Sequence, residues 1–187
     1  MRIMFRSLVL LFVMLSLVSC KKTLKPEELP PHIVIGNSYY TQFVIRYEKN
    51  VHLTSNFRRG GAIPVNTKVR LTKITSKTIE VELENSVKPL VIKNVPKHTG
   101  DDVFQAFDKL FSIKKLNLRK FNSKERRNIK NGTVAKGMRK KAVNVAIGYP
   151  PITYTMNLDA DTWVYFSGRF NRFNVNFRNN KVSSIKD

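Results

Sequence analysis

The stretch "KGMRKKAVNVAIGYPP", residues 136–151, decides the fold of the C-terminal part of the chain. Gly148 stands where a helix favours a left-handed cap, and Pro150 and Pro151 prevent a helix from continuing. The apolar residues before this stop recur at helical spacing. They predict an amphipathic helix over residues 139–147, with a core-facing stripe of Met138, Ala142, Val145, Ala146 and Tyr149.

Beyond this helix, apolar and polar residues alternate, as they do in strands with one buried face. Asn179 and Asn180 favour a hairpin turn before the last of these segments. The alternating segments are 152–158 (Ile152, Tyr154, Met156 and Leu158), 163–166, 173–177 and 182–185. We therefore expect an antiparallel sheet with two helices packed on one of its faces.

Residues 37–97 show the same period of two in shorter runs. Phe43, Ile45 and Tyr47 recur at every second position, and residues 79–83 alternate between apolar and polar side chains. Residues 75–78 have the composition of a turn in a hairpin from 68 to 84. This pattern predicts a small antiparallel β-rich domain, for which an SH3-like barrel is one candidate topology. The fold class expected for the whole chain is α+β.

Residues 98–121 are expected to form a helix that connects the β-rich domain to a C-terminal domain over 122–187. Thr99 would cap this helix, and Asp101 and Asp102 would place favourable negative charge in its first turn. Its core-facing stripe would consist of Val103, Phe104, Phe107, Leu110 and Phe111.

The charge of the chain predicts an anionic partner. Lys and Arg number 34 against 13 Asp and Glu, a formal net charge of +21. Residues 119–141 are the most basic segment, with Glu125 as their single acid. This segment is either a solvated helical face or a binding patch for anionic lipid headgroups or an acidic protein. The candidate contact residues are Arg126, Arg127, Lys130, Arg139, Lys140 and Lys141.

Catalytic and metal-binding motifs are missing from the sequence. It has no Gly-x-Ser-x-Gly motif and no glycine-rich phosphate loop, and its three histidines are widely separated. The one cysteine permits no internal disulfide. We expect a protein that is not an enzyme and that holds neither a cofactor nor a metal ion.

The N-terminus has the composition of a secretory signal. Arg2 and Arg6 precede an apolar run over residues 7–18, which is shorter than the roughly twenty residues that a membrane-spanning helix needs. The "LVSC" that ends at Cys20 resembles the lipobox of bacterial lipoproteins, in which the cysteine is acylated and becomes the new N-terminus. The alternative is an uncleaved N-terminal anchor. We expect a signal peptide over 1–19 and a lipid anchor with a proline-containing tether over 20–36.

A set of motifs over residues 123–185 resembles the SmpA/OmlA (BamE-like) family of bacterial lipoproteins. The motifs are Gly137-Met138, Ile147-Gly148-Tyr149-Pro150, Asp161-Thr162-Trp163-Val164-Tyr165 and Val175-Asn176-Phe177-Arg178-Asn179. The resemblance implies two helices against a three-stranded antiparallel sheet, in an outer-membrane lipoprotein that faces the periplasm and acts by binding. For Trp163, core packing is favoured over an exposed binding role. The motif residues expected to be mostly structural are Gly137, Met138, Gly148, Pro150, Trp163, Tyr165 and Phe177.

Together these observations predict a non-enzymatic lipoprotein anchored on the periplasmic side of the outer membrane. Its role would be that of a β-barrel assembly accessory or an envelope scaffold, with the membrane, anionic headgroups and outer-membrane assembly proteins as partners. Export excludes nucleic acid as a partner despite the charge. The alternative is a module that recognises peptidoglycan or another periplasmic ligand through the N-terminal β domain. That alternative requires an exposed groove of Tyr39, Tyr40, Tyr47 and Phe57.

Overall fold

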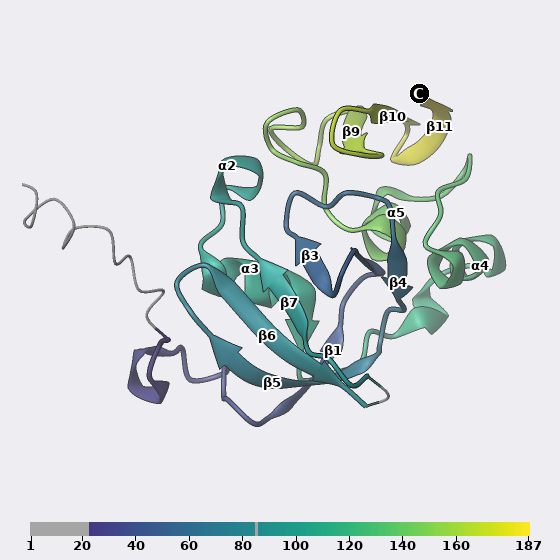
Figure 1. Cartoon of the computed structure of the whole chain (residues 1–187). Helices are drawn as coiled ribbons and strands as arrows, with labels where there is room; N and C mark the ends of the chain where they lie inside the picture. Colours follow the sequence, from purple (N-terminus) through teal and green to yellow (C-terminus); the bar gives the residue numbers. More distant parts are fainter. Residues whose placement is uncertain (1–22, 85) are drawn as a thin grey trace, which may run out of the picture.

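Figure 1 shows the computed structural model of the chain, which describes residues 23–84 and 86–187. The expected signal peptide and Cys20 lie outside the described residues. The described chain is mixed α+β, with a curled six-stranded sheet in its N-terminal half and a separate three-stranded antiparallel sheet in its C-terminal half. Within residues 23–84 and 86–187, every helix is too short or too polar to cross a bilayer.

The six-stranded sheet has the strand order β3-β7-β6-β5-β1-β8, and β2 pairs with β4 in a small sheet of its own. The hairpin expected over 68–84 is confirmed as β5 and β6. The expectation of a purely antiparallel sheet is wrong at one pair, because β3 runs parallel to β7. The elements of this half are η1 (Pro26–Glu28), β1 (Ser38–Thr41), β2 (Ile45–Tyr47), β3 (Val51–Leu53), β4 (Gly61–Ile63), β5 (Lys68–Ile74), β6 (Thr78–Leu83), β7 (Leu90–Lys93), α2 (Pro96–Thr99), α3 (Val103–Leu110) and β8 (Phe111–Ser112).

The first core lies between the curled sheet and α3. Alternate residues of β5 and β6 point into it, among them Leu71 and Val81, both fully buried. Helix α3 contributes the ring of Phe107, which packs edge-on against Tyr39 at 4.9 Å between ring centroids. Because α3 buries its apolar stripe here, it belongs to the N-terminal half.

Helix α3 differs from the expected connecting helix in its start and its length. Asp102 is its N-cap, and the Asp102 carboxylate accepts hydrogen bonds from the backbone N–H groups of Phe104 and Gln105. Asp101 lies before the helix and not in its first turn, and Thr99 belongs to the short α2. The helix ends at Leu110 because the next residues extend and pair with β1 as strand β8.

Residues 23–36 pack on the N-terminal half, so the expectation of a free tether over 20–36 is wrong for this part. Ile33 is 2 % exposed and belongs to the first core, and Leu24 and Leu29 pack against that core. The backbone N–H of Leu24 donates to the carbonyl of Ile74 at 3.0 Å. The burial of these three apolar side chains outweighs the conformational entropy that a free linker would keep.

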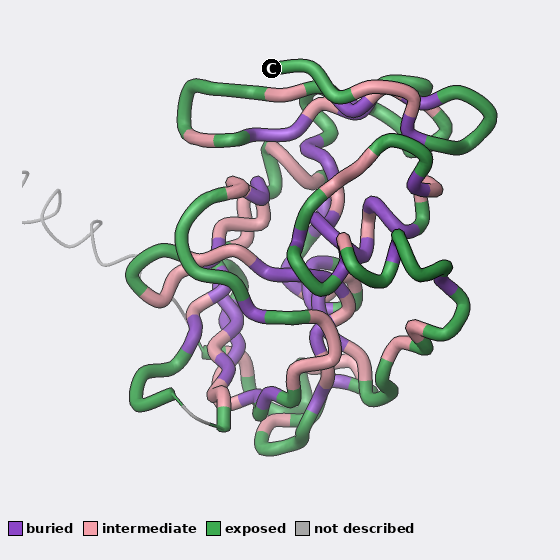
Figure 2. Tube along the Cα trace, turned by 90° about the vertical axis from the view of Figure 1, so that its right-hand side faces the viewer, coloured by how far each residue is buried: buried purple, intermediate pink, exposed green. Residues whose placement is uncertain are grey.

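The second core lies between two helices and the three-stranded sheet, whose strand order is β11-β10-β9. The helix expected over 139–147 is confirmed as α5, and Asn179 and Asn180 form the expected turn. Figure 2 shows buried stretches of chain in both halves of the molecule. The elements of the C-terminal half are η2 (Leu118–Lys120), α4 (Ser123–Asn131), α5 (Lys140–Ile147), β9 (Thr162–Phe166), β10 (Arg172–Arg178) and β11 (Lys181–Lys186).

The strand expected over residues 152–158 is wrong. The segment forms turns, in which the backbone N–H groups of Tyr154 and Thr155 both donate to the carbonyl of Pro151. The apolar side chains of this segment were expected to be buried and the polar ones exposed. The structure shows the reverse, since Met156 is 91 % exposed and Thr155 is 4 % exposed. The buried hydroxyl of Thr155 is satisfied, because it accepts the N–H of Val164 at 2.9 Å.

One short segment of the N-terminal half connects the two cores at a contact region that we call the junction. The buried side-chain amide of Asn56 donates to the carbonyls of Ile147 and Tyr149 at 2.7 and 2.9 Å. The Arg58 guanidinium donates to the carbonyls of Val44 and Gly132, at 3.2 and 3.4 Å. The two halves are therefore joined by hydrogen bonds to the ends of both α4 and α5.

Candidate functional site

The basic segment lies on α4 and the start of α5, where its residues have different roles. The Arg139 guanidinium donates to both carboxylate oxygens of Glu125, at 2.8 and 2.6 Å, and to the carbonyl of Lys120. The side chain of Glu125 is 1 % exposed and also accepts the N–H of Asn122 at the start of α4. Hydrogen bonds from Arg139 lower the pKa of Glu125 to about 2, and the carboxylate raises the pKa of Arg139. Arg139 therefore links the start of α5 to α4 through its ion pair with Glu125.

Two further members of the basic set are also engaged within the fold. Arg126 donates to the carbonyl of Phe121 and to the hydroxyl of Ser123. Lys140 donates to the carbonyl of Asp159 at 2.8 Å, and its ammonium stands 5.7 Å from the ring centroid of Trp163. Both side chains keep their charge near the surface but are held in place.

The remaining three members are exposed cations that make no side-chain hydrogen bond or ion pair in the described part of the chain. Arg127 and Lys130 lie on α4, and Lys141 lies in the first turn of α5. Lys141 and Lys140 line an open groove of about 470 Å³, which also reaches Lys109 and Asp159. We call this the basic groove, and together with Arg127 and Lys130 it offers exposed positive charge to a partner.

The family-motif residues lie mostly in the second core. Trp163 is 1 % exposed, Tyr165 is fully buried, and the Tyr165 hydroxyl donates to the carbonyl of Gly148 at 3.0 Å. Gly148 has a φ of +75°, and a Cβ there would lie 2.7 Å from the ring of Phe43. Among the others, Met138, Pro150 and Phe177 are buried, and Gly137 has a φ of +88°.

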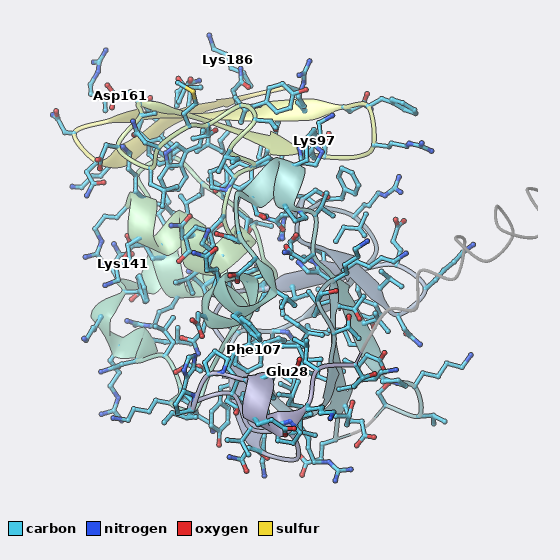
Figure 3. All side chains as sticks on the ribbon, turned by 90° about the vertical axis from the view of Figure 1, so that its left-hand side faces the viewer. Glu28, Lys97, Phe107, Lys141, Asp161 and Lys186 are labelled. Atoms are coloured by element: carbon cyan, nitrogen blue, oxygen red, sulfur yellow. The ribbon has the colours of Figure 1, made fainter. Side chains whose placement is uncertain are left out.

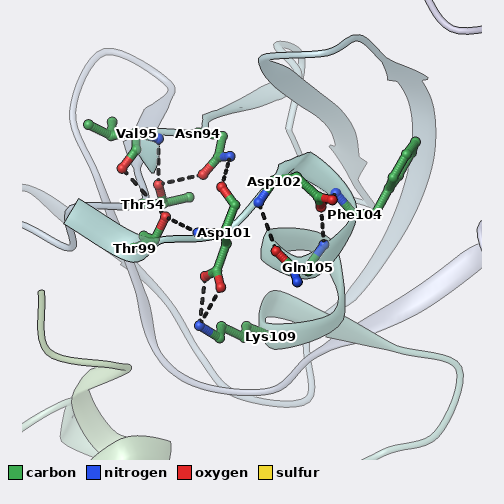
Figure 4. A network of polar contacts seen from close by, with 9 residues as sticks. All are labelled: Thr54, Asn94, Val95, Thr99, Asp101, Asp102, Phe104, Gln105 and Lys109. Carbon is green, nitrogen blue, oxygen red and sulfur yellow. Dashed lines mark hydrogen bonds and ion pairs between the residues drawn. The ribbon is translucent and has the colours of Figure 1, made fainter. Parts of the chain in front are cut away.

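A cavity of about 130 Å³ lies at the junction, next to the basic groove. Figure 4 shows the polar network on its wall, in which the Lys109 ammonium lies 2.7 Å from both carboxylate oxygens of Asp101. Burial lowers the pKa of His52, on the same wall, to about 4, so this imidazole is neutral. The cavity wall therefore has no net charge, and its size suits a molecule of roughly the volume of benzene.

Sequence reasoning missed the residues that build the junction. Asn56, Arg58 and His52 gave no signal in the sequence, because their partners are carbonyl groups that a periodicity does not reveal. The capping pair Asn122 and Glu125 was visible as an Asn-x-x-Glu motif ahead of the basic helix. Among the residues that the structure describes, no group of three or more His, Cys, Asp or Glu side chains could hold a metal ion.

Comparisons with known proteins identify no relative of this chain. No protein-family model, no curated protein and no solved structure matches the chain. The resemblance to SmpA/OmlA lipoproteins therefore depends on the order of the sequence motifs alone.

The different roles of Arg139 and Lys141 can be tested by one pair of substitutions. We expect Arg139→Ala to lower the melting temperature by several degrees at pH 7, because it leaves the buried Glu125 carboxylate without its charged partner. Lys141→Ala should change it by about 1 °C or less, because that side chain is exposed and unpaired.

The stabilisation by the ion pair of Glu125 and Arg139 depends on pH. The pKa of Glu125 is lower in the folded chain than its ordinary value, so the contribution of the pair is present above about pH 4.5 and is lost as the pH falls toward 2. The difference in melting temperature between the two variants should become smaller as the pH falls over that range. Thermal unfolding followed by circular dichroism measures it. Equal melting temperatures of the two variants at pH 7 would show that the ion pair of Arg139 contributes no more to stability than the unpaired side chain of Lys141.

Proposed function

We propose that this chain is a non-enzymatic lipoprotein, anchored through Cys20 on the periplasmic side of the outer membrane, that binds an acidic partner. Its role would be that of an accessory of outer-membrane β-barrel assembly or of an envelope scaffold. The observation that carries the binding role is the set of exposed cations Arg127, Lys130 and Lys141, none of which forms an ion pair with an acidic side chain of the described chain. The anchor is supported by the "LVSC" motif that ends at Cys20.

The arrangement of the C-terminal half supports the resemblance on which this role depends. Helices α4 and α5 lie against a three-stranded antiparallel sheet, which are the elements that an SmpA/OmlA-like domain would have. We do not extend the proposal to an SH3-like barrel in the N-terminal half, because the parallel pair of β3 and β7 departs from an antiparallel barrel. We therefore assign the proposed binding surface to the C-terminal half.

The alternative role in peptidoglycan recognition lacks a supporting observation. It requires four aromatic side chains to gather in one exposed groove. Tyr39 is 1 % exposed and lies in the first core, whereas Tyr47 and Phe57 line a separate surface groove on the N-terminal half. Tyr40 lies on β1, beneath the ammonium of Lys115. The geometry favours the cationic surface as the binding site.

The anchor is tested by labelling cells with a palmitate analogue. Cys20→Ser should leave the precursor unprocessed and unlabelled, since the acylated sulfur is absent. The matched control Ser19→Ala keeps a small residue before the cysteine and should be labelled normally. Normal labelling of Cys20→Ser would reject the lipid anchor.

The acidic partner is tested by affinity purification from gently solubilised membranes. The triple variant Arg127→Glu, Lys130→Glu, Lys141→Glu should recover at least about tenfold less of the partner, because each near-surface charge contact contributes about 1 kcal/mol. The control Lys68→Glu, Lys88→Glu, Lys114→Glu changes the net charge equally at exposed positions of the chain outside α4 and α5. Recovery of a partner without any barrel-assembly component would contradict the assembly role and favour the scaffold.

A further inference from the structure

The first described residues are fixed to one end of the curled sheet. Thr23 forms an antiparallel bridge with Thr75, and Leu24 donates to the carbonyl of Ile74. Thr75 begins the tight turn between β5 and β6, where its hydroxyl accepts the backbone N–H groups of Lys77 and Thr78 at 3.2 and 2.9 Å. The point where the described chain begins is therefore held by a hydrogen-bonded turn. We call this end of the molecule, with Thr23, Ser76 and Lys77, the anchor end.

Only Lys21 and Lys22 separate Cys20 from Thr23. Three residue steps span at most about 11 Å, whatever their conformation. If Cys20 is acylated as proposed above, on which this inference rests, the anchor end must lie within that distance of the membrane interface. A lipoprotein with a free tether of fifteen or more residues would have no such restriction.

The charge at the anchor end suits an anionic lipid surface. Lys25, Lys77 and Lys93 are exposed and have no ion-pair partner in the described chain, and Lys21 and Lys22 add two more cations in the sequence. Asn94 donates to the carbonyl of Lys77 at 2.9 Å, so the end of β7 lies beside the turn. Glu27 and Glu28 on η1 are the acids of this segment, and the Glu28 carboxylate accepts the N–H of Lys25.

Helix α4 lies on the opposite side of the molecule. Figure 1 places it across the molecule from the point where the described chain begins, and Figure 3 shows Lys141, on the neighbouring α5, at one edge of the molecule and away from Glu28. A folded chain of this length has a radius of gyration of about 15 Å, whereas charges are screened over about 8 Å at physiological salt. Arg127 and Lys130 are therefore too far from the anchoring leaflet to interact with its headgroups.

We propose that the anchor end sits directly on the membrane that holds Cys20, so that α4 faces away from it and the cations of α4 bind an acidic protein. This orientation decides between the two partners considered for the basic patch, which were anionic lipid headgroups and an acidic protein. The lysines near Thr23 meet the lipid, and Arg127 and Lys130 meet the partner across the periplasm.

The test measures which side of the molecule is near the lipid. The chain has one cysteine, whose sulfur would carry the lipid, so a newly introduced cysteine is the only site for a thiol-reactive fluorophore. Ser76→Cys reports on the anchor end, and Asn131→Cys, exposed at the last residue of α4, is the matched control. The full-length lipoproteins are placed in vesicles of phosphatidylethanolamine and phosphatidylglycerol that contain a lipid with a spin-labelled headgroup.

We expect the fluorophore at residue 76 to be quenched several-fold more strongly than the one at residue 131. Insertion of a flexible twenty-residue Gly/Ser segment between Lys22 and Thr23 should remove this difference, because such a segment spans about 25 Å on average. Equal quenching in the chain without the insert, or stronger quenching at residue 131, would overturn the orientation.

The palmitate analogue is measured in the same samples, which separates two kinds of failure. Protein that carries the label but shows no preference for residue 76 overturns the orientation and leaves the lipid anchor intact. Protein that carries no label and does not stay on the vesicles overturns both.

Discussion

The hydrogen bonds of Asn56 and Arg58 across the junction are the contacts on which the rest of the structure depends. The Arg58 guanidinium is largely buried and meets carbonyl groups in place of a carboxylate, and burial lowers its pKa to about 10. These acceptors, together with the side-chain oxygen of Asn56 at 3.3 Å, offset the cost of burying the charge. The backbone bond from Val44 to Val145 adds a direct link between the halves. The two cores are thus held in one relative position.

A fixed junction keeps two groups of cationic side chains at constant positions relative to each other. The lysines near Thr23 belong to the N-terminal half, whereas Arg127, Lys130 and Lys141 belong to helices α4 and α5 of the second core. If the halves moved freely, either set could reach the membrane. Because they are joined, the two sets keep the separation that the proposed membrane orientation requires. The cavity at the junction shares lining residues with the basic groove, and its ion pair of Asp101 and Lys109 adds no net charge there.

Periodicity predicted the elements whose burial follows from their own sequence, such as α5 and the β5–β6 hairpin. It failed over residues 152–158, where the chain turns at Pro151 and the Thr155 hydroxyl accepts the N–H of Val164 while the four apolar side chains stay partly or largely exposed. Prolines suggested a tether over 20–36, yet Ile33 is buried in the first core. The six basic candidates looked equivalent, and only the tertiary position of Glu125 separates Arg139 from Lys141. In each of these cases the burial or the role of a side chain is set by contacts between segments that are distant in the sequence. A local sequence pattern carries no information about such contacts.

The coupling of the two cores is tested most directly by unfolding the protein in urea with two probes. Trp163 is the one tryptophan of the chain and lies in the second core, so its fluorescence reports on that core alone. Far-ultraviolet circular dichroism reports on the secondary structure of both halves. We predict that the two transitions coincide in midpoint and slope, as for a single cooperative unit. Two separate midpoints would contradict a fixed junction, and with it the division of the charges between membrane and partner.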